Sequence, residues 1–162
     1  MDKRFLFLSF ASAALIVPSI SNAHLVEAPM EVMATVVSSC ELSVTPIDFG
    51  NYAGAEINTT GEVIVVCNDG VPYKIAMNAG MNTDNANRRM ADSSGNNTLP
   101  YRLTYQGVDW GDLGVHDTFL SNPVQGVGTG AASSFVVEAM LFEAQDVPPG
   151  VYSDTVIVSV DF

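Results

Sequence analysis

Gly150-Val151-Tyr152-Ser153-Asp154-Thr155-Val156-Ile157-Val158-Ser159-Val160-Asp161-Phe162 is the stretch that decides the fold class. Its apolar residues alternate with small or polar ones, and Ile157 is the apolar exception on the polar face. Because successive side chains of a β-strand point to opposite faces, a period of two indicates a strand with one buried face. Pro148-Pro149-Gly150 supplies a turn before it. We therefore predict a strand over 151–162 that continues to the last residue of the sequence.

The same alternation recurs upstream, in the stretches 30–36, 42–49, 63–67, 73–77, 99–105 and 135–142. Turn-forming stretches such as Asn68-Asp69-Gly70 separate them, and no sustained helical stripe of apolar residues follows the first residues. Short alternating strands at this spacing predict an all-β sandwich or barrel. Two irregular windows, 80–98 and 107–132, are predicted to be long surface loops.

The first residues are typical of a secretion signal. Lys3 and Arg4 precede an apolar run of about 13 residues, and Ser21-Asn22-Ala23 forms a cleavage site of the small-x-small type. The run is shorter than the roughly 20 residues that span a bilayer, although an uncleaved anchor is the alternative interpretation. We predict a signal peptide over 1–23, export through the inner membrane, and roughly 140 remaining residues that form one domain without a membrane span.

Charge narrows the class of partner. The chain has 18 acidic and 6 basic residues, with a formal net charge of −12 at pH 7. Such a surface repels phosphate backbones, and no basic stripe opposes the repulsion. We therefore expect that the protein does not bind nucleic acid.

Cys40 and Cys67 are the two cysteines of the sequence. An even number of cysteines in an exported chain predicts a disulfide between them. A metal-binding or redox-active pair is the alternative, but the spacing is far from Cys-x-x-Cys and no histidine lies nearby in the sequence.

No combination of nucleophile, base or metal ligands predicts an enzyme, so we expect no catalytic residue, no cofactor and no metal site. The acidic stretch from Asp109 to Asp117, which contains Trp110, Asp112 and His116, allows two interpretations. One is a divalent-cation or carbohydrate site with an exposed tryptophan. The other, which we favour, is a solvated loop whose tryptophan packs on the sandwich. Arg88-Arg89 is interpreted as a pair of surface charges.

An ordered set of short motifs, none specific by itself, covers nearly the whole chain after residue 23. It comprises Cys40, Asp48-Phe49-Gly50-x-Tyr52, Gly61-x-Val63-x-Val65-x-Cys67, Tyr73-x-Ile75, Arg89-Met90, Leu99-x-Tyr101-x-Leu103-x-Tyr105, Trp110-Gly111 and Gly150-x-Tyr152-x-Asp154-Thr155-Val156-x-Val158-x-Val160-x-Phe162. In this order the motifs resemble the spore coat protein U family, which includes the subunits of archaic chaperone–usher pili.

The resemblance implies an incomplete immunoglobulin-like β-sandwich that lacks its last strand. A periplasmic chaperone fills the gap during folding, and at an outer-membrane usher the N-terminal segment of a neighbouring subunit replaces it by donor-strand exchange. The expected product is a cell-surface pilus for adhesion and biofilm formation, and the expected location is the periplasm in transit and then the cell surface. The expected domains are a donor-strand segment, 24–37, and a pilin domain, 38–162.

A donor strand needs apolar side chains at alternate positions, and the N-terminal segment offers Met30, Val32, Ala34 and Val36. Pro29 cannot donate a ladder hydrogen bond, which favours these positions over those before it. The acceptor groove, and the chaperone-binding strand, should present Val156, Val158, Val160 and Phe162. The alternative is a self-contained secreted sandwich, either a coat module or a carbohydrate-binding module, in which the N-terminal row pairs within its own domain.

Overall fold

The computed structural model describes residues 24–84, 87–114 and 121–162. The predicted signal peptide, together with His116 and Asp117, lies outside these described residues. Within them the regular structure consists of β-strands without a helix, which confirms the all-β prediction. The chain divides into two units, Met1–Thr35 and Val36–Phe162.

The described part of the first unit, residues 24–35, is extended and belongs to no strand. Its apolar side chains are open to solvent: Met30 is 86% exposed and Val32 is 87% exposed. Alternation alone therefore does not make this stretch a strand of its own chain, because a strand needs a ladder partner.

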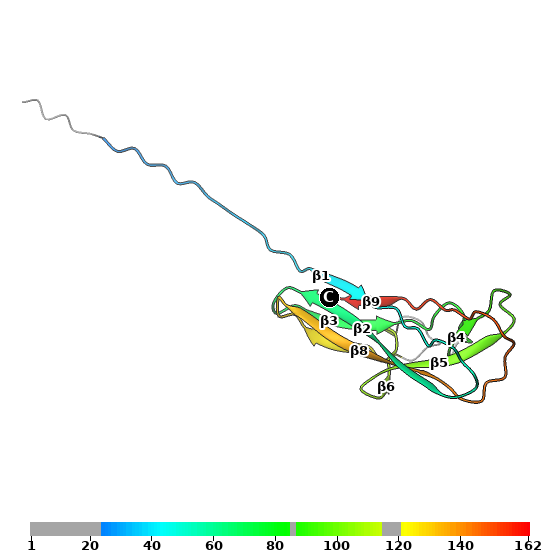
Figure 1. Ribbon diagram of the computed structural model, residues 1–162. Helices are drawn as coiled ribbons and strands as arrows, with labels where there is room; N and C mark the ends of the chain where they lie inside the picture. Colours follow the sequence, from blue (N-terminus) through cyan, green and yellow to red (C-terminus); the bar gives the residue numbers. More distant parts are fainter. Residues whose placement is uncertain (1–23, 85–86, 115–120) are drawn as a thin grey trace, which may run out of the picture. The chain divides into compact units, whose positions relative to one another are not determined.

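The second unit is built from two antiparallel sheets (Figure 1). The larger sheet has the order β1 (Cys40–Val44), β2 (Ile57–Cys67), β8 (Ala132–Leu141), β5 (Thr98–Tyr105) and β4 (Arg88–Ala91), with β6 (Val108–Asp109) paired to β5. The smaller sheet has the order β7 (Val124–Val127), β3 (Pro72–Met77) and β9 (Val158–Asp161).

The core lies between the two sheets. Alternate residues of β2, β5 and β8 point inward from the larger sheet, and alternate residues of β3 meet them from the smaller one. Ile75 at the centre of β3 is fully buried, and its carbonyl oxygen accepts a hydrogen bond of 2.9 Å from Nε1 of Trp110. Period-two burial in both sheets makes this domain a sandwich.

Strands β4, β6 and β7 lie inside the windows predicted to be loops, so that prediction was wrong in part. In β7, Gly126 resembles a turn signal, but the Tyr73 ring lies directly over it and leaves no room for a side chain. A glycine inside a strand often marks such a close approach. In β4, Arg88 points inward on the same face as Met90, and an inward arginine breaks the apolar alternation that predicts strands.

Arg88 is therefore not part of a surface pair, and that interpretation was wrong. Its side chain is buried, with Nη2 donating to the carbonyl oxygens of Met77 at 2.9 Å and Trp110 at 2.7 Å, and Nε donating to that of Asn78 at 2.9 Å. Three backbone carbonyls thus solvate a cation that burial would otherwise penalise. Desolvation lowers the pKa of Arg88 to about 10.

The last strand is shorter than predicted. Ladder pairing with β3 covers Val158–Asp161, whereas Ser153 pairs with Ala91 of the larger sheet through two backbone hydrogen bonds of 2.9 and 3.0 Å. The final segment thus crosses from one sheet to the other. Its alternation persists: Ile157 and Ser159 are exposed, and the side chains that are half-buried against the core are those of Tyr152, Val156, Val158 and Val160.

An open apolar groove as the candidate functional site

Strand β1 shows that the core is uncovered along one side. Leu42 lies opposite Val65 and Val44 lies opposite Val63, and directly opposed residues of an antiparallel pair point to the same face. Val63 and Val65 are each 1% exposed, whereas Leu42 is 39% exposed and Val44 is 53% exposed. Side chains that face the core are therefore left half open to solvent.

The two strands that flank this opening each have a free edge. In the described part of the chain, β1 pairs only with β2 and β9 pairs only with β3. The two strands lie side by side at the rim of the sandwich (Figure 1), and no ladder joins them. Free edges present unpaired backbone donors and acceptors to a further strand.

A groove with a volume of about 1170 Å³ lies between the residues that follow β1 and those that precede β9. Residues 44–54 form one wall and residues 144–156 form the other, together with Val158. Its lining includes the buried side chains of Val63, Val137 and Leu141, which belong to the main core. The groove therefore reaches the hydrophobic core of the domain and is more than a shallow depression in its surface.

The predicted acceptor residues divide into two sets. Val156, Val158 and Val160 pack against the core from the β9 side, and the first two line the groove. Phe162 is 55% exposed and is not among the lining residues. The structure thus places three of the four residues together along one side of the opening.

The first wall is fixed by contacts that the sequence did not indicate. The Tyr52 hydroxyl donates to the Phe142 carbonyl oxygen at 2.9 Å and accepts from the Gln145 amide at 2.9 Å. Ile47 packs over Gly61 of β2, where an added Cβ would lie 2.7 Å from Cγ1 of Ile47. These contacts tie residues 46–54 to β2 and, through Gln145, to the start of the opposite wall, so the two walls are joined at that point.

Asp154 fixes the second wall. Its Oδ1 accepts from the backbone amides of Met81 at 2.9 Å and Thr155 at 2.8 Å, and its Oδ2 accepts from the Tyr101 hydroxyl at 2.7 Å. Burial raises the pKa of Tyr101 far above its usual value, and the hydrogen bond to Asp154 acts in the same direction. The groove wall is thereby tied both to the core and to the loop after β3.

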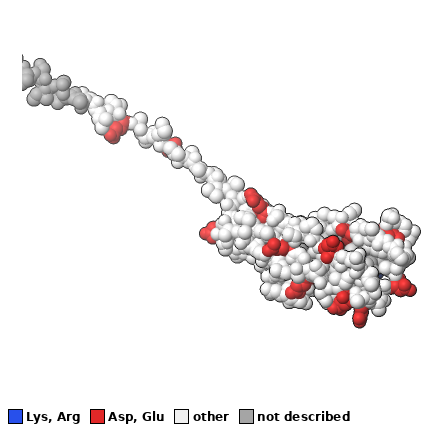
Figure 2. Space-filling view, viewed as in Figure 1, with Lys and Arg blue, Asp and Glu red and all other residues white. Residues whose placement is uncertain are grey.

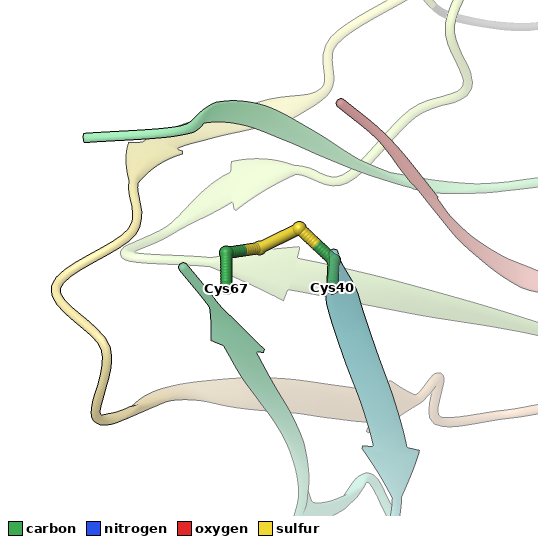
Figure 3. Close-up of a disulfide and its surroundings, with 2 residues drawn as sticks. All are labelled: Cys40 and Cys67. Carbon is green, nitrogen blue, oxygen red and sulfur yellow. A yellow bond between two sulfur atoms is a disulfide. The ribbon is translucent and has the colours of Figure 1, made fainter. Parts of the chain in front are cut away.

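The predicted disulfide is confirmed. Figure 3 shows Cys40 at the start of β1 bonded to Cys67 at the end of β2, with a separation of 27 residues in sequence. Beside it, the Asn68 amide donates to the Ser39 carbonyl oxygen at 3.1 Å. The disulfide therefore fixes the first residue of β1, the strand that borders the opening, to the end of β2.

The acidic stretch has the packed tryptophan that we favoured. Trp110 is 1% exposed, so it cannot stack on a sugar at the surface, and Asp109 forms an ion pair with Arg102 at 3.1 Å. Asp112 is buried and not solvated, and its Oδ1 accepts from the Gly114 amide at 2.7 Å. Within the described ranges, no group of three histidine, cysteine or acidic side chains is arranged to hold a metal ion.

A model of the Spore Coat Protein U domain matches residues 26–159. The chain belongs to the spore coat protein U domain family. No curated protein matches this family member in sequence. The described residues also contain no helix with the length and hydropathy of a membrane span.

Two solved structures resemble this spore coat protein U domain. One comes from the CsuC–CsuE chaperone–tip adhesion subunit pre-assembly complex of the archaic chaperone–usher Csu pili of Acinetobacter baumannii. The TM-score is 0.58 with 21% identity, over 79% of this chain and 40% of that chain. The other is HdaB, the minor tip subunit of the E. coli Hda pilus, with a TM-score of 0.41 and 17% identity over 74% and 79% of the two chains. This chain thus spans less than half of the first structure's chain, and the likeness to that first structure confirms the immunoglobulin-like sandwich.

Sequence reasoning assigned the β9 side of the opening but missed the β1 side. Leu42 and Val44 are two and four residues after Cys40, so their side chains point to the same face of β1 as that of Cys40. Once Cys40 is taken to point into the core, this spacing predicts that Leu42 and Val44 also point there. Asp154 and Tyr52 gave no such signal, because their partners are far away in sequence.

Proposed function

We propose that this protein is a structural subunit of a chaperone–usher pilus and polymerises by donor-strand complementation. The observation that carries the proposal is the apolar groove between the free edges of β1 and β9. A single strand placed there would gain backbone hydrogen bonds along an edge and would cover the open core at the same time. The pilin domain is then incomplete by one strand.

The N-terminal segment has the properties that such an occupant needs. Met30, Val32 and Val36 are each 86–87% exposed and lie at alternate positions, with Ala34 between the two valines. Burying the three large side chains would contribute about 5–9 kcal/mol before the costs of ordering are subtracted. We therefore assign residues 24–37 as the donor and the β1–β9 opening of another subunit as the acceptor.

The connection to β1 favours exchange between chains over folding back within one chain. Ser39 is held at the end of β2 by the Asn68 amide. A return of Val36 alongside β1 would leave Val37 and Ser38 to form a two-residue hairpin turn. Such turns require positive φ and favour Asn and Gly, whereas a β-branched valine strongly resists this conformation.

Insertion also requires a small movement. At their closest the Cα atoms of β1 and β9 lie within 8 Å of each other. A strand between two edges needs two spacings of about 4.8 Å, so the edges must part by at least about 2 Å where they are closest. The rim between residues 44–54 and the segment before β9 is already wide, which makes it the natural place for a donor to enter.

The partners and the route follow from this mechanism. We propose a periplasmic chaperone that covers the groove before assembly, an outer-membrane usher, and neighbouring pilus subunits. Export through the inner membrane, passage through the periplasm and display in a cell-surface fibre for adhesion and biofilm formation complete the proposal. No catalytic step is assigned to any residue.

Two matched substitutions in the full-length gene test the donor assignment. Val32→Asp places a carboxylate on the row that would enter the groove, whereas Met33→Asp places it one residue away on the opposite face, and both side chains are 87% exposed. We expect Val32→Asp to abolish fibres on the cell surface and Met33→Asp to leave them largely intact. Fibre yield is measured by electron microscopy and by the ladder of polymers in unboiled gels.

Soluble periplasmic subunit is the control for folding and chaperone binding, because neither substitution touches the acceptor groove. Equal fibre yield from the two variants would refute the assignment of Met30, Val32, Ala34 and Val36. A stable monomer that lacks residues 24–37 and has no affinity for the corresponding peptide would instead favour the self-contained secreted sandwich.

A further inference from the structure

The charges around the groove have one sign. Its acidic lining residues include Asp48, Asp146 and Asp154, and within the described residues its lining includes no lysine or arginine. Figure 2 shows that acidic groups also predominate on the face of the domain that it presents. An incoming strand therefore meets a negative potential before it meets the apolar lining.

The edges beside the opening continue this pattern. Glu41 of β1 and Asp161 of β9 are exposed residues that alternate with the inward rows of their strands. Lys74, opposite Asp161 in the ladder with β3, is the base that offsets them in part. An inserted strand with its apolar row inward would bring its outward residues into the same layer as Glu41 and Asp161.

The basic residues elsewhere in the domain do little to change this potential. Arg88 is buried, and Arg89 and Arg102 form ion pairs with Asp84 and Asp109. The charges of Arg89 and Arg102 are therefore largely compensated by their partners, whereas that of Arg88 offsets part of the acidic charge through its attraction to Asp109, Asp154 and Asp112. The groove keeps its negative surroundings, and at physiological salt these act over about 8 Å.

The N-terminal segment of this same chain is also acidic. Residues 24–37 contain Glu27 and Glu31 and no lysine or arginine. Glu31 lies between Met30 and Val32, so it points outward when they point into a groove. In a junction between two copies of this chain, Glu31 would thus share a layer with carboxylates of the acceptor.

We propose that the groove of this protein is built for the N-terminal strand of a different subunit, one with lysine or arginine on its outward face. This inference rests on the proposed function. The apolar lining admits any strand with alternating apolar residues, and the acidic rim then selects among such strands by charge. A junction between two copies of this chain is correspondingly slow to form at low ionic strength.

Association rates of synthetic peptides with the purified full-length chain test this. Fluorescently labelled peptides of residues 24–37 are used in the native form, as Glu27→Gln/Glu31→Gln and as Glu27→Lys/Glu31→Lys, with a Val32→Asp peptide as the non-binding control. Between about 20 and 500 mM NaCl we expect the native peptide to associate at least threefold faster and the lysine peptide at least threefold more slowly, because salt screens repulsion and attraction alike. The glutamine peptide should fall between them.

Equal rates and equal salt dependence for the native, glutamine and lysine peptides would overturn the charge selection while leaving strand addition in place. Failure of all of them to bind at every salt concentration would overturn both proposals. A second measurement uses full-length chains alone: Glu27→Lys/Glu31→Lys should polymerise faster than the native chain at low salt and at a similar rate at high salt. Faster polymerisation of the native chain at low salt would also overturn the charge selection.

Discussion

Reduction of the Cys40–Cys67 disulfide should destabilise the domain in a way that centres on β1. The bond closes a loop with a sequence separation of 27 residues. On the chain-entropy model, a loop of this size stabilises the folded state by about 3.5 kcal/mol. For a domain of this length, with a urea dependence of roughly 1.5 kcal/mol per molar, this corresponds to a fall of about 2 M in the unfolding midpoint.

The structure explains why β1 should respond most. Leu42 and Val44, its inward side chains, are 39% and 53% exposed, so each gains only about half of its full burial energy. Together they contribute about 2–3 kcal/mol, which is less than the disulfide contributes. Without the bond, the remaining support of β1 is its one-sided ladder with β2.

Urea unfolding followed by circular dichroism, with and without dithiothreitol, measures the total effect. Hydrogen exchange at the amides of residues 41–44 and of β8 shows where it acts. Reduction retains both sulfur atoms, whereas replacement of Cys67, which is 2% exposed, would also leave a cavity. A chain with both cysteines replaced by alanine controls for effects of the reductant itself.

A midpoint shift below about 0.7 M would refute the loop-entropy reasoning, since it corresponds to roughly 1 kcal/mol. Exchange that accelerates equally in β1 and in β8 would refute the local part of it. If both parts hold, the reduced chain should also bind a donor peptide less well, because β1 forms one border of the proposed acceptor groove.

Two further predictions concern pH. The pKa of Tyr101 is raised by burial and by its hydrogen bond to Asp154. As pH rises, this hydroxyl therefore ionises in the unfolded chain before it ionises in the folded one. The stability that Tyr101 contributes is retained below about pH 10 and falls as pH rises above that value. Tyr101→Phe should flatten that alkaline fall in urea midpoint, and an unchanged slope would contradict the assignment. Hydrogen bonds from Asn97 and Ser94 lower the pKa of Asp92 to about 2. The contribution of Asp92 to folding stability is therefore present above its usual pKa near 3.8 and is lost as pH falls toward 2. Nuclear magnetic resonance titration should place the midpoint of Asp92 near 2, and Asp92→Asn should weaken the acid dependence of stability.

The sequence predicted the parts of the fold that rest on local alternation. Strands β3, β5 and β8 closely match predicted stretches and β2 contains one, because each has a buried face whose side chains alternate. Strands β4 and β7 were missed because Arg88 and Gly126 occupy positions where the pattern requires an apolar residue. Their partners, three carbonyl groups for Arg88 and the Tyr73 ring for Gly126, become neighbours only in the folded chain.

The candidate site divides in the same way. Val156, Val158 and Val160 were assigned to one side of a groove from their alternation and from the family resemblance, and the structure places them against the core beside the opening. That a donor strand binds there stays a prediction. The opposite border, with Leu42 and Val44, could not be assigned, because the alternation of β1 looks the same whether or not another strand covers it.

By itself the sequence determined that this is an all-β chain with one disulfide, and it determined which side chains face inward in the strands whose side chains alternate, β2, β3, β5 and β8. Both follow from chemistry that acts between near neighbours: a period of two along a strand, and an even number of cysteines. Only the tertiary structure decided that the sandwich is open between β1 and β9, since an uncovered core is a property of the order of strands in two sheets. No local pattern records this opening, because each strand present satisfies its own alternation.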